Sequence, residues 1–240
     1  MKTYYKQHCE NLRMIEKAIT SVQRMLREYI RKDQPMNVYI YTKLLSHLIN
    51  SWAEVRALKL IYEKAAFSDA EKLKLIKCDQ LDARWILLLT ISFCKSYKIL
   101  PRKLDSVETP ITARTRYKML SELAQNDLLE SSQLRNRIAH GQWKYAFNKD
   151  MLEINQQLTM RLRQENIVKL QLKYKMFKSL AQIIHDLAVS RPTFERDFDK
   201  NFRKLEGQKA NFHGRKYDDY KNMLIARRQK YIQTKTKPAT

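Results

Sequence analysis

The sequence predicts an all-α protein, a bundle of long helices with one small β-hairpin. Apolar residues recur every three to four positions through most of the 240 residues, as on the buried face of an α-helix. Prolines and short polar stretches separate these periodic segments. Between residues 143 and 154 the pattern changes to an alternation of apolar and polar residues, which is typical of strands.

Three helices are expected in the first third of the chain. The first, over residues 4–31, has its apolar residues at helical spacing: Leu12, Ile15, Ile19, Val22, Leu26 and Ile30. Pro35 separates it from a second helix, which we expect Asn37 to cap and which runs to about residue 67. Ser68 and Glu71 have the spacing of a capping box and predict a short third helix ending near Cys78.

The middle of the chain is expected to hold the centre of the bundle. Residues 79–100 are apolar on nearly all sides, which predicts the most buried helix, and Pro101 ends it. Another helix is expected over residues 111–125. A turn or cap at Asn126 and Asp127 then leads into the helix that carries residues 134–140.

The last part of the chain begins with the predicted hairpin. Trp143, Tyr145 and Phe147 alternate with polar residues, and residues 148–150 can form the turn. Helices follow over residues 166–189, 193–205 and 217–232. The second of these carries phenylalanines at every fourth position from residue 194 to 202, which either dock on the bundle or build a dimer interface. We expect one helical domain over residues 1–205 and a basic extension over 206–240.

The charge of the chain favours a polyanionic partner. It has 47 Lys and Arg against 25 Asp and Glu, a formal net charge of +22, which points to RNA or DNA. A ribosomal or chromatin-like partner and an anionic membrane surface are alternatives. No uncharged apolar run of about 18 residues is present and the N-terminus lacks the apolar core of a signal peptide, so we expect a cytoplasmic protein that does not span a membrane.

The three cysteines carry no pattern of a metal site. Cys9, Cys78 and Cys94 lack the CxxC or histidine spacing of a ligand set, and they are expected to be reduced thiols that pack in the protein. Glycine-rich phosphate loops and Ser-His-Asp orders are also missing from the sequence. We therefore expect neither a metal ion nor a cofactor.

The stretch from Leu134 to Trp143 has the strongest chemical character. Gly141, one of only 3 glycines, is expected at the C′ position where its helix ends. Asn136 and His140 are four residues apart and share a helix face, so Asn136 can orient the imidazole. Arg135 points about 140° away from His140 on an ideal helix. It reaches the histidine through its length, through unwinding at Gly141, or from a second subunit across a two-fold axis.

An arginine and a histidine suit cleavage of RNA by its own 2′-hydroxyl. The ordinary pKa of histidine is about 6.5, so His140 can exchange a proton with the hydroxyl or with the leaving 5′-oxygen near neutral pH. The fork of Arg135 can bind the scissile phosphate and stabilise its growing charge. A purely structural alternative is that both residues stabilise the C-terminal end of a helix.

The segment from Arg135 to Gly141 resembles the motif of the HEPN superfamily (higher eukaryotes and prokaryotes nucleotide-binding). Its ribonucleases carry an arginine, four to six residues and then a histidine, and Asn136 matches the usual polar residue after the arginine. The resemblance implies a helical domain that forms a homodimer, in which two motifs make one metal-independent endoribonuclease site. It also implies a toxin or antiviral-defence effector, with an antitoxin or another inhibitory partner.

Further residues near the motif are candidates for the site. Basic charge predicts RNA contacts at Arg137 and, from the preceding helix, at Arg114 and Arg116, although ordinary solvated charges explain the latter two equally well. Because HEPN proteins often add polar residues from an earlier helix, the candidates there are Glu54, Arg56 and Lys59. The simpler alternative for these three is a solvated, salt-bridged helix face.

Two other functions fit the sequence. One is a non-catalytic helical module that binds RNA or a protein partner through the same basic surface. The other is an acceptor for a nucleotidyltransferase, which modifies some HEPN proteins, usually at a tyrosine. No tyrosine lies between Arg135 and His140, which argues against the second.

Overall fold

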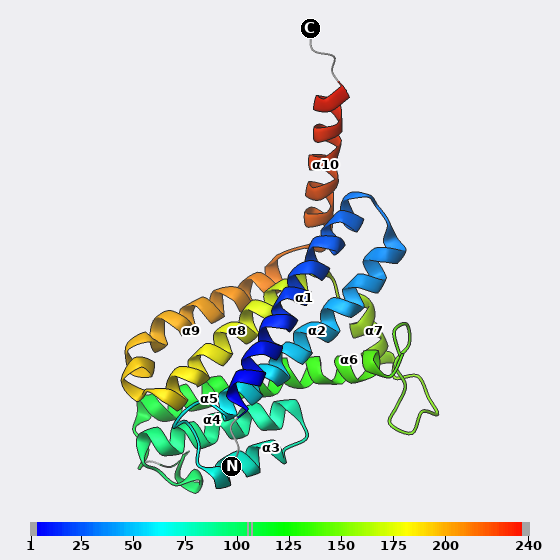
Figure 1. The fold of residues 1–240 in the computed structure, drawn as a ribbon. Coiled ribbons are helices and arrows are strands. Elements are labelled where there is room, and N and C mark those ends of the chain that lie inside the picture. The colour runs from blue at the N-terminus through cyan, green and yellow to red at the C-terminus, as the bar shows by residue number, and fades with distance from the viewer. Residues whose placement is uncertain (1–3, 105, 107, 237–240) are drawn as a thin grey trace.

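The computed structural model describes residues 4–104, 106 and 108–236. In this part of the chain all regular structure is helical, which confirms the all-α prediction (Figure 1). A 3₁₀ turn at Pro101–Lys103 and a π-helical turn at Ala124–Leu128 accompany the α-helices. The α-helices are α1 (Tyr5–Arg31), α2 (Pro35–Ile61), α3 (Asp69–Ile76), α4 (Leu81–Tyr97), α5 (Ile111–Leu123), α6 (Leu129–Ala139), α7 (Gln156–Gln164), α8 (Ile167–Val189), α9 (Arg191–Gly214) and α10 (Tyr217–Thr236).

Helices α1 and α2 form a long hairpin along one side of the molecule (Figure 1). Pro35 is the first residue of α2, so the prediction that Asn37 caps this helix is wrong. Proline suits that position because its φ is already helical and because the first N–H of a helix has no intrahelical partner. The predicted capping box of α3 is confirmed: the Ser68 hydroxyl accepts from the Glu71 N–H at 3.3 Å, and the Glu71 carboxylate accepts from the Ser68 N–H at 2.7 Å.

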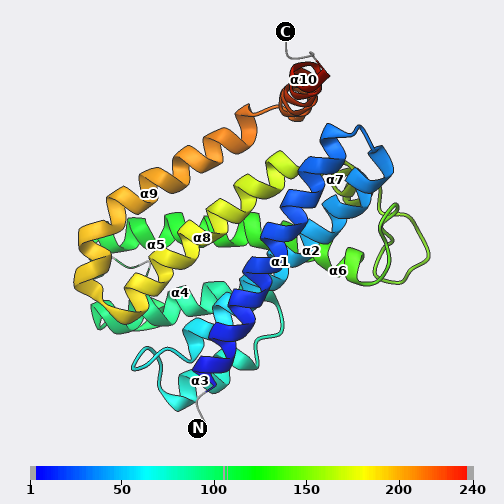
Figure 2. The same cartoon turned by 45° about the horizontal axis from the view of Figure 1, so that its top comes forward.

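The middle of the bundle is built on α4 and α8, and α9 lies alongside α8 (Figure 2). Helix α4 packs against α2, α5, α6 and α8, in agreement with the central place predicted for it. The phenylalanines of α9 dock on the bundle: the ring of Phe194 lies 5.7 Å from that of Phe93 on α4, and 5.2 Å from that of Phe198. Of the two expectations for this stripe, docking is the one observed.

Three connections differ from the predictions. The π-helical turn replaces the expected turn at Asn126 and Asp127, so α5 continues into α6 with little change of secondary structure. Helix α7 was not predicted; Asn155 caps it by accepting from the Leu158 N–H at 2.9 Å. Helix α9 continues to Gly214 and so crosses the boundary predicted at residue 205.

The predicted β-hairpin is a loop. Among the described residues, 143–155 contain one antiparallel bridge, between Phe147 and Ile154, and no strand. Two backbone hydrogen bonds close this bridge, from the Asn148 N–H to the Glu153 carbonyl and from the Asn155 N–H to the Ala146 carbonyl, both at 2.8 Å. The pairing goes no further, because the Ala146 N–H, which the next bond of a ladder would use, donates to Oγ1 of Thr159 at 2.9 Å. Alternating residues alone therefore did not make strands here.

The buried apolar residues form two separate clusters. The main cluster takes residues from α1 to α5 and from α8 to α10. The second cluster lies where α6 ends and α7 begins, and its buried members are Leu134, Ile138, Ala146, Leu158 and Leu162. Trp143 packs against it and is only partly exposed. The end of the motif helix thus has a small core of its own.

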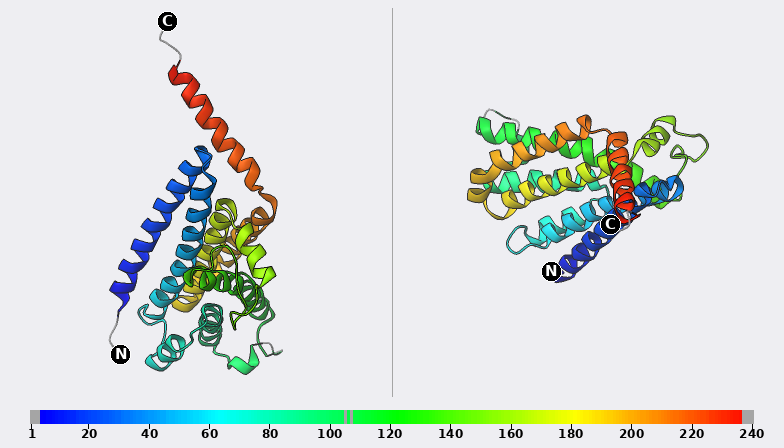
Figure 3. Two further views of the ribbon diagram at one scale, coloured as in Figure 1. Left: turned by 90° about the vertical axis from the view of Figure 1, so that its right-hand side faces the viewer. Right: turned by 90° about the horizontal axis from the view of Figure 1, so that it is seen from above.

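Helix α10 is fixed to the bundle near its beginning and extends beyond it (Figure 3). Leu224 is buried in the main cluster, and the ammonium of Lys221 lies 2.8 Å from the carboxylate of Asp33. Further along, the guanidinium of Arg228 donates to the Arg31 carbonyl at 3.1 Å. Tyr231, beyond these contacts, is exposed. The position of the first half of α10 is therefore set by contacts with α1 and the turn after it.

Candidate functional site

Helix α6 ends as its glycine predicts. Gly141 has a φ of +75°, the left-handed conformation that glycine adopts without strain. Its N–H donates to the Ile138 carbonyl at 3.1 Å, and the Gln142 N–H donates to the Arg137 carbonyl at 2.9 Å. These are the two hydrogen bonds of a Schellman motif, which satisfy the last carbonyls of the helix.

Arg135 is held by an acidic residue of α2. Its Nη2 lies 2.5 Å from Oε1 of Glu54, and its Nη1 donates to Oδ1 of Asn136 at 3.0 Å. The Nε of Arg135 is buried and has no partner among the described residues. Of the three polar candidates from the earlier helix, Glu54 is therefore the one that contacts the motif.

His140 lies at the exposed end of α6. Its backbone N–H donates to the Asn136 carbonyl at 3.1 Å. Within the described residues, the side-chain hydrogen bonds of Arg135 go to Glu54 and Asn136, and none goes to His140. The amide oxygen of Asn136, expected to orient the imidazole, accepts from Arg135 instead. Within one chain, Arg135 is thus bonded to Glu54 and Asn136, whereas the His140 side chain is exposed at the end of the helix.

His47 is a neighbour of this ion pair that sequence reasoning missed. It precedes Glu54 by seven residues on α2, which places the two side chains about 20° apart around the helix. Burial lowers the pKa of His47, the charge of Arg135 lowers it further, and the charge of Glu54 opposes the change. The seven-residue spacing was visible in the sequence, but nothing there showed that this face of α2 meets α6.

The chain after His140 is tied to α2 and α6. The hydroxyl of Tyr39 on α2 donates to the Trp143 carbonyl, and the indole N–H of Trp143 donates to the Ile138 carbonyl at 3.0 Å. Trp143 therefore packs against the end of α6 and the second cluster. Tyr145 is exposed, and the guanidinium of Arg163 lies 5.1 Å from its ring centre.

A buried lysine fixes the other end of the second cluster. The Lys43 side chain is 1% exposed, its ammonium donates to the Leu162 carbonyl, and it lies 3.6 Å from Oε2 of Glu165. The Ser46 hydroxyl donates to Oε1 of the same carboxylate at 2.8 Å. Burial lowers the pKa of Lys43, and the charge of Glu165 opposes this. These bonds anchor the end of α7 to α2.

The other predicted residues lie apart from the ion pair. Arg116 packs on the aromatic stripe of α9, with its guanidinium 4.3 Å from the ring centre of Phe198, and it pairs with Glu195 and Asp199. Its side chain is only 12% exposed, so in this structure the guanidinium is occupied by packing and ion pairs with α9. Arg114 and Arg137 are partly exposed.

The two remaining candidates from α2 lie in another group. Lys59 pairs with Glu63 at 3.3 Å, and its ammonium lies 4.8 Å from the ring centre of Tyr5. Arg56 is partly buried near the same carboxylate. Burial lowers the pKa of Arg56, and the charge of Glu63 opposes this. Neither residue joins Arg135.

Comparison with known proteins gives no family for this chain. No family model matches it, and no curated protein and no solved structure matches it. In the described ranges, no helix is both long and apolar enough to cross a membrane. The same residues include no group of three or more His, Cys, Asp or Glu side chains placed to hold a metal ion.

Proposed function

We propose that this protein is a metal-independent endoribonuclease of the HEPN type, with a HEPN-like helical domain. The observation that supports the proposal best is the pair of groups at the end of α6. Arg135 is oriented by Glu54 and Asn136, and His140 is exposed one turn later with no ion pair among the described residues. An oriented cation and an accessible imidazole are the two groups that cleavage by the 2′-hydroxyl needs.

In the proposed reaction the RNA supplies the nucleophile. The imidazole of one His140 takes the proton of the 2′-hydroxyl, and the 2′-oxygen forms a bond to the adjacent phosphorus. The bond from phosphorus to the 5′-oxygen breaks, and a second His140 side chain, which starts as the protonated imidazolium, gives its proton to that oxygen. The products are a 2′,3′-cyclic phosphate and a 5′-hydroxyl. Arg135 binds the non-bridging phosphate oxygens and stabilises their charge in the transition state.

The reaction uses two imidazoles, which is the reason to propose a homodimer. One subunit has a single His140, and its own Arg135 is bound to Glu54 and Asn136. A two-fold axis near the exposed end of α6 gives each site a His140 from either subunit and two arginines. Such an isologous contact is the commonest way in which identical chains associate. In its host, a nuclease of this kind acts as a toxin or defence effector that an inhibitory partner restrains.

Replacing His140 tests this proposal. We expect the parent protein to cut total RNA in the presence of EDTA and to leave 2′,3′-cyclic phosphate ends. We expect His140→Ala to reduce cleavage about a hundredfold or more and to keep the helical circular dichroism of the parent. His213→Ala, an exposed histidine in the last turn of α9, is the matched control and should cut like the parent.

Three results would contradict the proposal. They are cleavage by His140→Ala at the parental rate, loss of the parental cleavage in EDTA, and a protein that sediments as a monomer at the concentrations at which it cuts RNA. Salt-dependent RNA binding without any cleavage would instead favour the non-catalytic module.

A further inference from the structure

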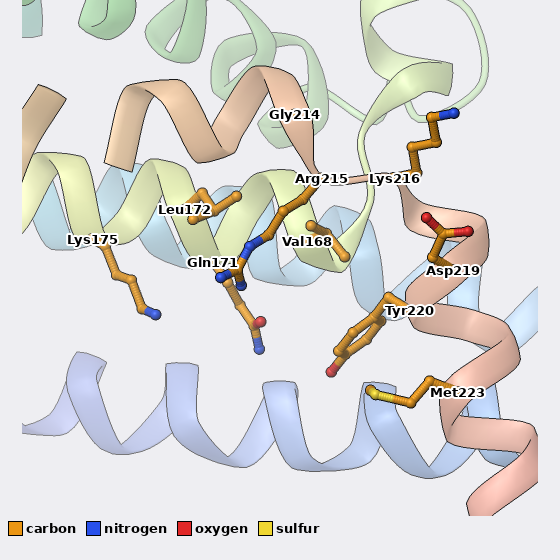
Figure 4. Close-up of a pocket in the computed structure, with 10 residues that line it drawn as sticks. All are labelled: Val168, Gln171, Leu172, Lys175, Gly214, Arg215, Lys216, Asp219, Tyr220 and Met223. Carbon is orange, nitrogen blue, oxygen red and sulfur yellow. The ribbon is translucent and has the colours of Figure 1, made fainter. Parts of the chain in front are cut away.

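A groove formed by α8, α9 and the beginning of α10 collects basic side chains. Its two adjoining parts have volumes of 490 and 520 Å³ and share Leu172, Lys175 and Arg215. Figure 4 shows the first part, in which the side chains of Arg215, Gln171 and Lys175 extend into the same space. The two parts therefore make one continuous concave surface.

The groove has a strong excess of positive charge. Its cations are Lys175, Lys178, Lys204, Arg215 and Lys216, all exposed, and Asp219 is the one acidic residue in its lining. Lys178 pairs with Glu16 at 3.6 Å. Across the described part of the chain, Lys175, Lys204 and Lys216 form no ion pair with a carboxylate. Several unneutralised cations in one concave surface attract a polyanion more strongly than the same charges spread over a convex one.

Other side chains suit a nucleic acid better than a simple anion. Val168, Leu172 and the ring of Tyr220 give the first part apolar surface beside its charges (Figure 4). Bases can pack on such surface while the cations follow the phosphates. In the second part, Gln208 is partly exposed, and its buried amide oxygen has no hydrogen-bond partner in the part of the chain that the structure describes. Once the amide turns toward the groove, a ribose hydroxyl can bind it, because a hydroxyl can both donate and accept.

We propose that this groove of α8, α9 and α10 is a binding site for single-stranded RNA. The site is independent of the proposed cleavage at α6, because none of its residues belongs to α2 or α6. The wall of the groove that α10 forms is held in place, because Leu224 and the Lys221–Asp33 ion pair fix the beginning of this helix to the bundle. We propose a single strand and not a duplex, because the bases of a single strand are free to pack on the apolar surface of the groove.

Removing two of its cations tests the groove. The double variant Lys175→Gln/Arg215→Gln is compared with Lys74→Gln/Lys77→Gln, which loses two exposed cations in α3 and at its end. Binding of a fluorescein-labelled RNA of about 20 nucleotides with mixed sequence is followed by fluorescence anisotropy over a series of salt concentrations. We expect the groove variant to bind about tenfold more weakly, and the slope of log K against log salt to become shallower by about 1.4.

Two outcomes would overturn the site. One is an equal affinity of the two double variants for the RNA, which would mean that any pair of exposed cations contributes as much as the pair in the groove. The other is a groove variant that loses binding to phosphatidylserine vesicles and keeps its affinity for RNA. All proteins in this comparison also carry His140→Ala, so that the proposed cleavage does not consume the probe, and denaturing gels check that the RNA is intact.

A DNA of the same sequence tests the contact with ribose. The parent should prefer RNA, and Gln208→Leu should reduce that preference, because the 2′-hydroxyl is the group that distinguishes the two. Equal binding of RNA and DNA by the parent would overturn the assignment of Gln208.

Discussion

The two hydrophobic clusters of this protein differ in what holds them together. The main cluster gathers buried residues from eight of the helices, and its stability comes from the large apolar area that they remove from water. The second cluster has five buried residues, one of them an alanine. An apolar area of that size gives little net stability once the cost of ordering the chain is subtracted.

Hydrogen bonds of polar side chains add to the small apolar area of the second cluster. From α2, the hydroxyl of Tyr39 donates to the Trp143 carbonyl and the ammonium of Lys43 donates to the Leu162 carbonyl. The Thr159 hydroxyl accepts from the Ala146 N–H at 2.9 Å. His140 lies at this end of the molecule. Because this region buries few apolar residues, we expect it to open more easily than the main cluster, as is common for functional segments, and it carries the residue proposed for proton transfer.

The same substitution in each cluster is the strongest way to break this comparison. Leu60 of α2 and Leu162 of α7 are both fully buried, the first in the main cluster and the second in the small one. We expect Leu60→Ala to lower the free energy of unfolding by about 2–5 kcal/mol. Leu162→Ala should lower it less, because its cluster can open while the main one stays folded.

Denaturant titration measures the first effect, and hydrogen exchange measures the second. In Leu162→Ala the amides of residues 134–162 should exchange faster, while those of α4 and α8 keep their parental rates. Equal losses of global stability in the two variants would show that the clusters unfold as one unit.

The ion pair between Glu54 and Arg135 connects the two regions, and its removal is expected to have the next largest effect. Glu54 lies on α2, while Arg135 adjoins Leu134 of the second cluster. Both side chains are about three-tenths exposed, so Glu54→Ala should cost at most about 1 kcal/mol of stability. If Glu54 positions Arg135 for phosphate, kcat for RNA cleavage should fall about ten- to a hundredfold with a smaller change in KM.

An exposed acid elsewhere provides the control for that variant. Glu122 of α5 is exposed, and Glu122→Ala also removes one negative charge. It should leave kcat unchanged. A rise in KM alone in Glu54→Ala would mean that the carboxylate affects RNA binding and not the orientation of the arginine.

The sequence predicted the helices better than the connections between them. Periodicity identifies which face of a helix is buried, and Gly141 and the pair Ser68 and Glu71 identify ends through local backbone chemistry. The loop over residues 143–155 depended on Thr159, whose hydroxyl takes the Ala146 N–H that a longer strand pair would use. Competition of this kind comes from tertiary contacts, which spacing does not show.

Only part of the candidate site was predicted, because the rest of it also depends on tertiary contacts. The motif residues lie on one helix, so their spacing gives their relative directions. Which residues of α2 meet these motif residues depends on how α2 packs on α6, and the sequence does not show that packing. Glu54 was therefore only one of three candidates, and His47 was not predicted at all. Arg116 shows the converse case, since a basic residue near the motif in sequence serves the packing of α9.

The pH dependence of stability gives the smallest expected effect and tests whether His47 shares the surroundings of Arg135. Its pKa lies below the ordinary 6.5 in the folded protein, first because of burial and then because of the arginine's charge. As pH falls through about 6.5 the unfolded chain therefore binds a proton before the folded one does, and stability is lost. We expect the parent to lose stability between pH 7 and about 5 relative to His47→Gln, as measured by denaturant titration at each pH.

His8, whose pKa burial also lowers, is present in both proteins, so its contribution cancels in the difference between the two pH profiles. Parallel pH profiles would place His47 in ordinary solvent, away from the ion pair.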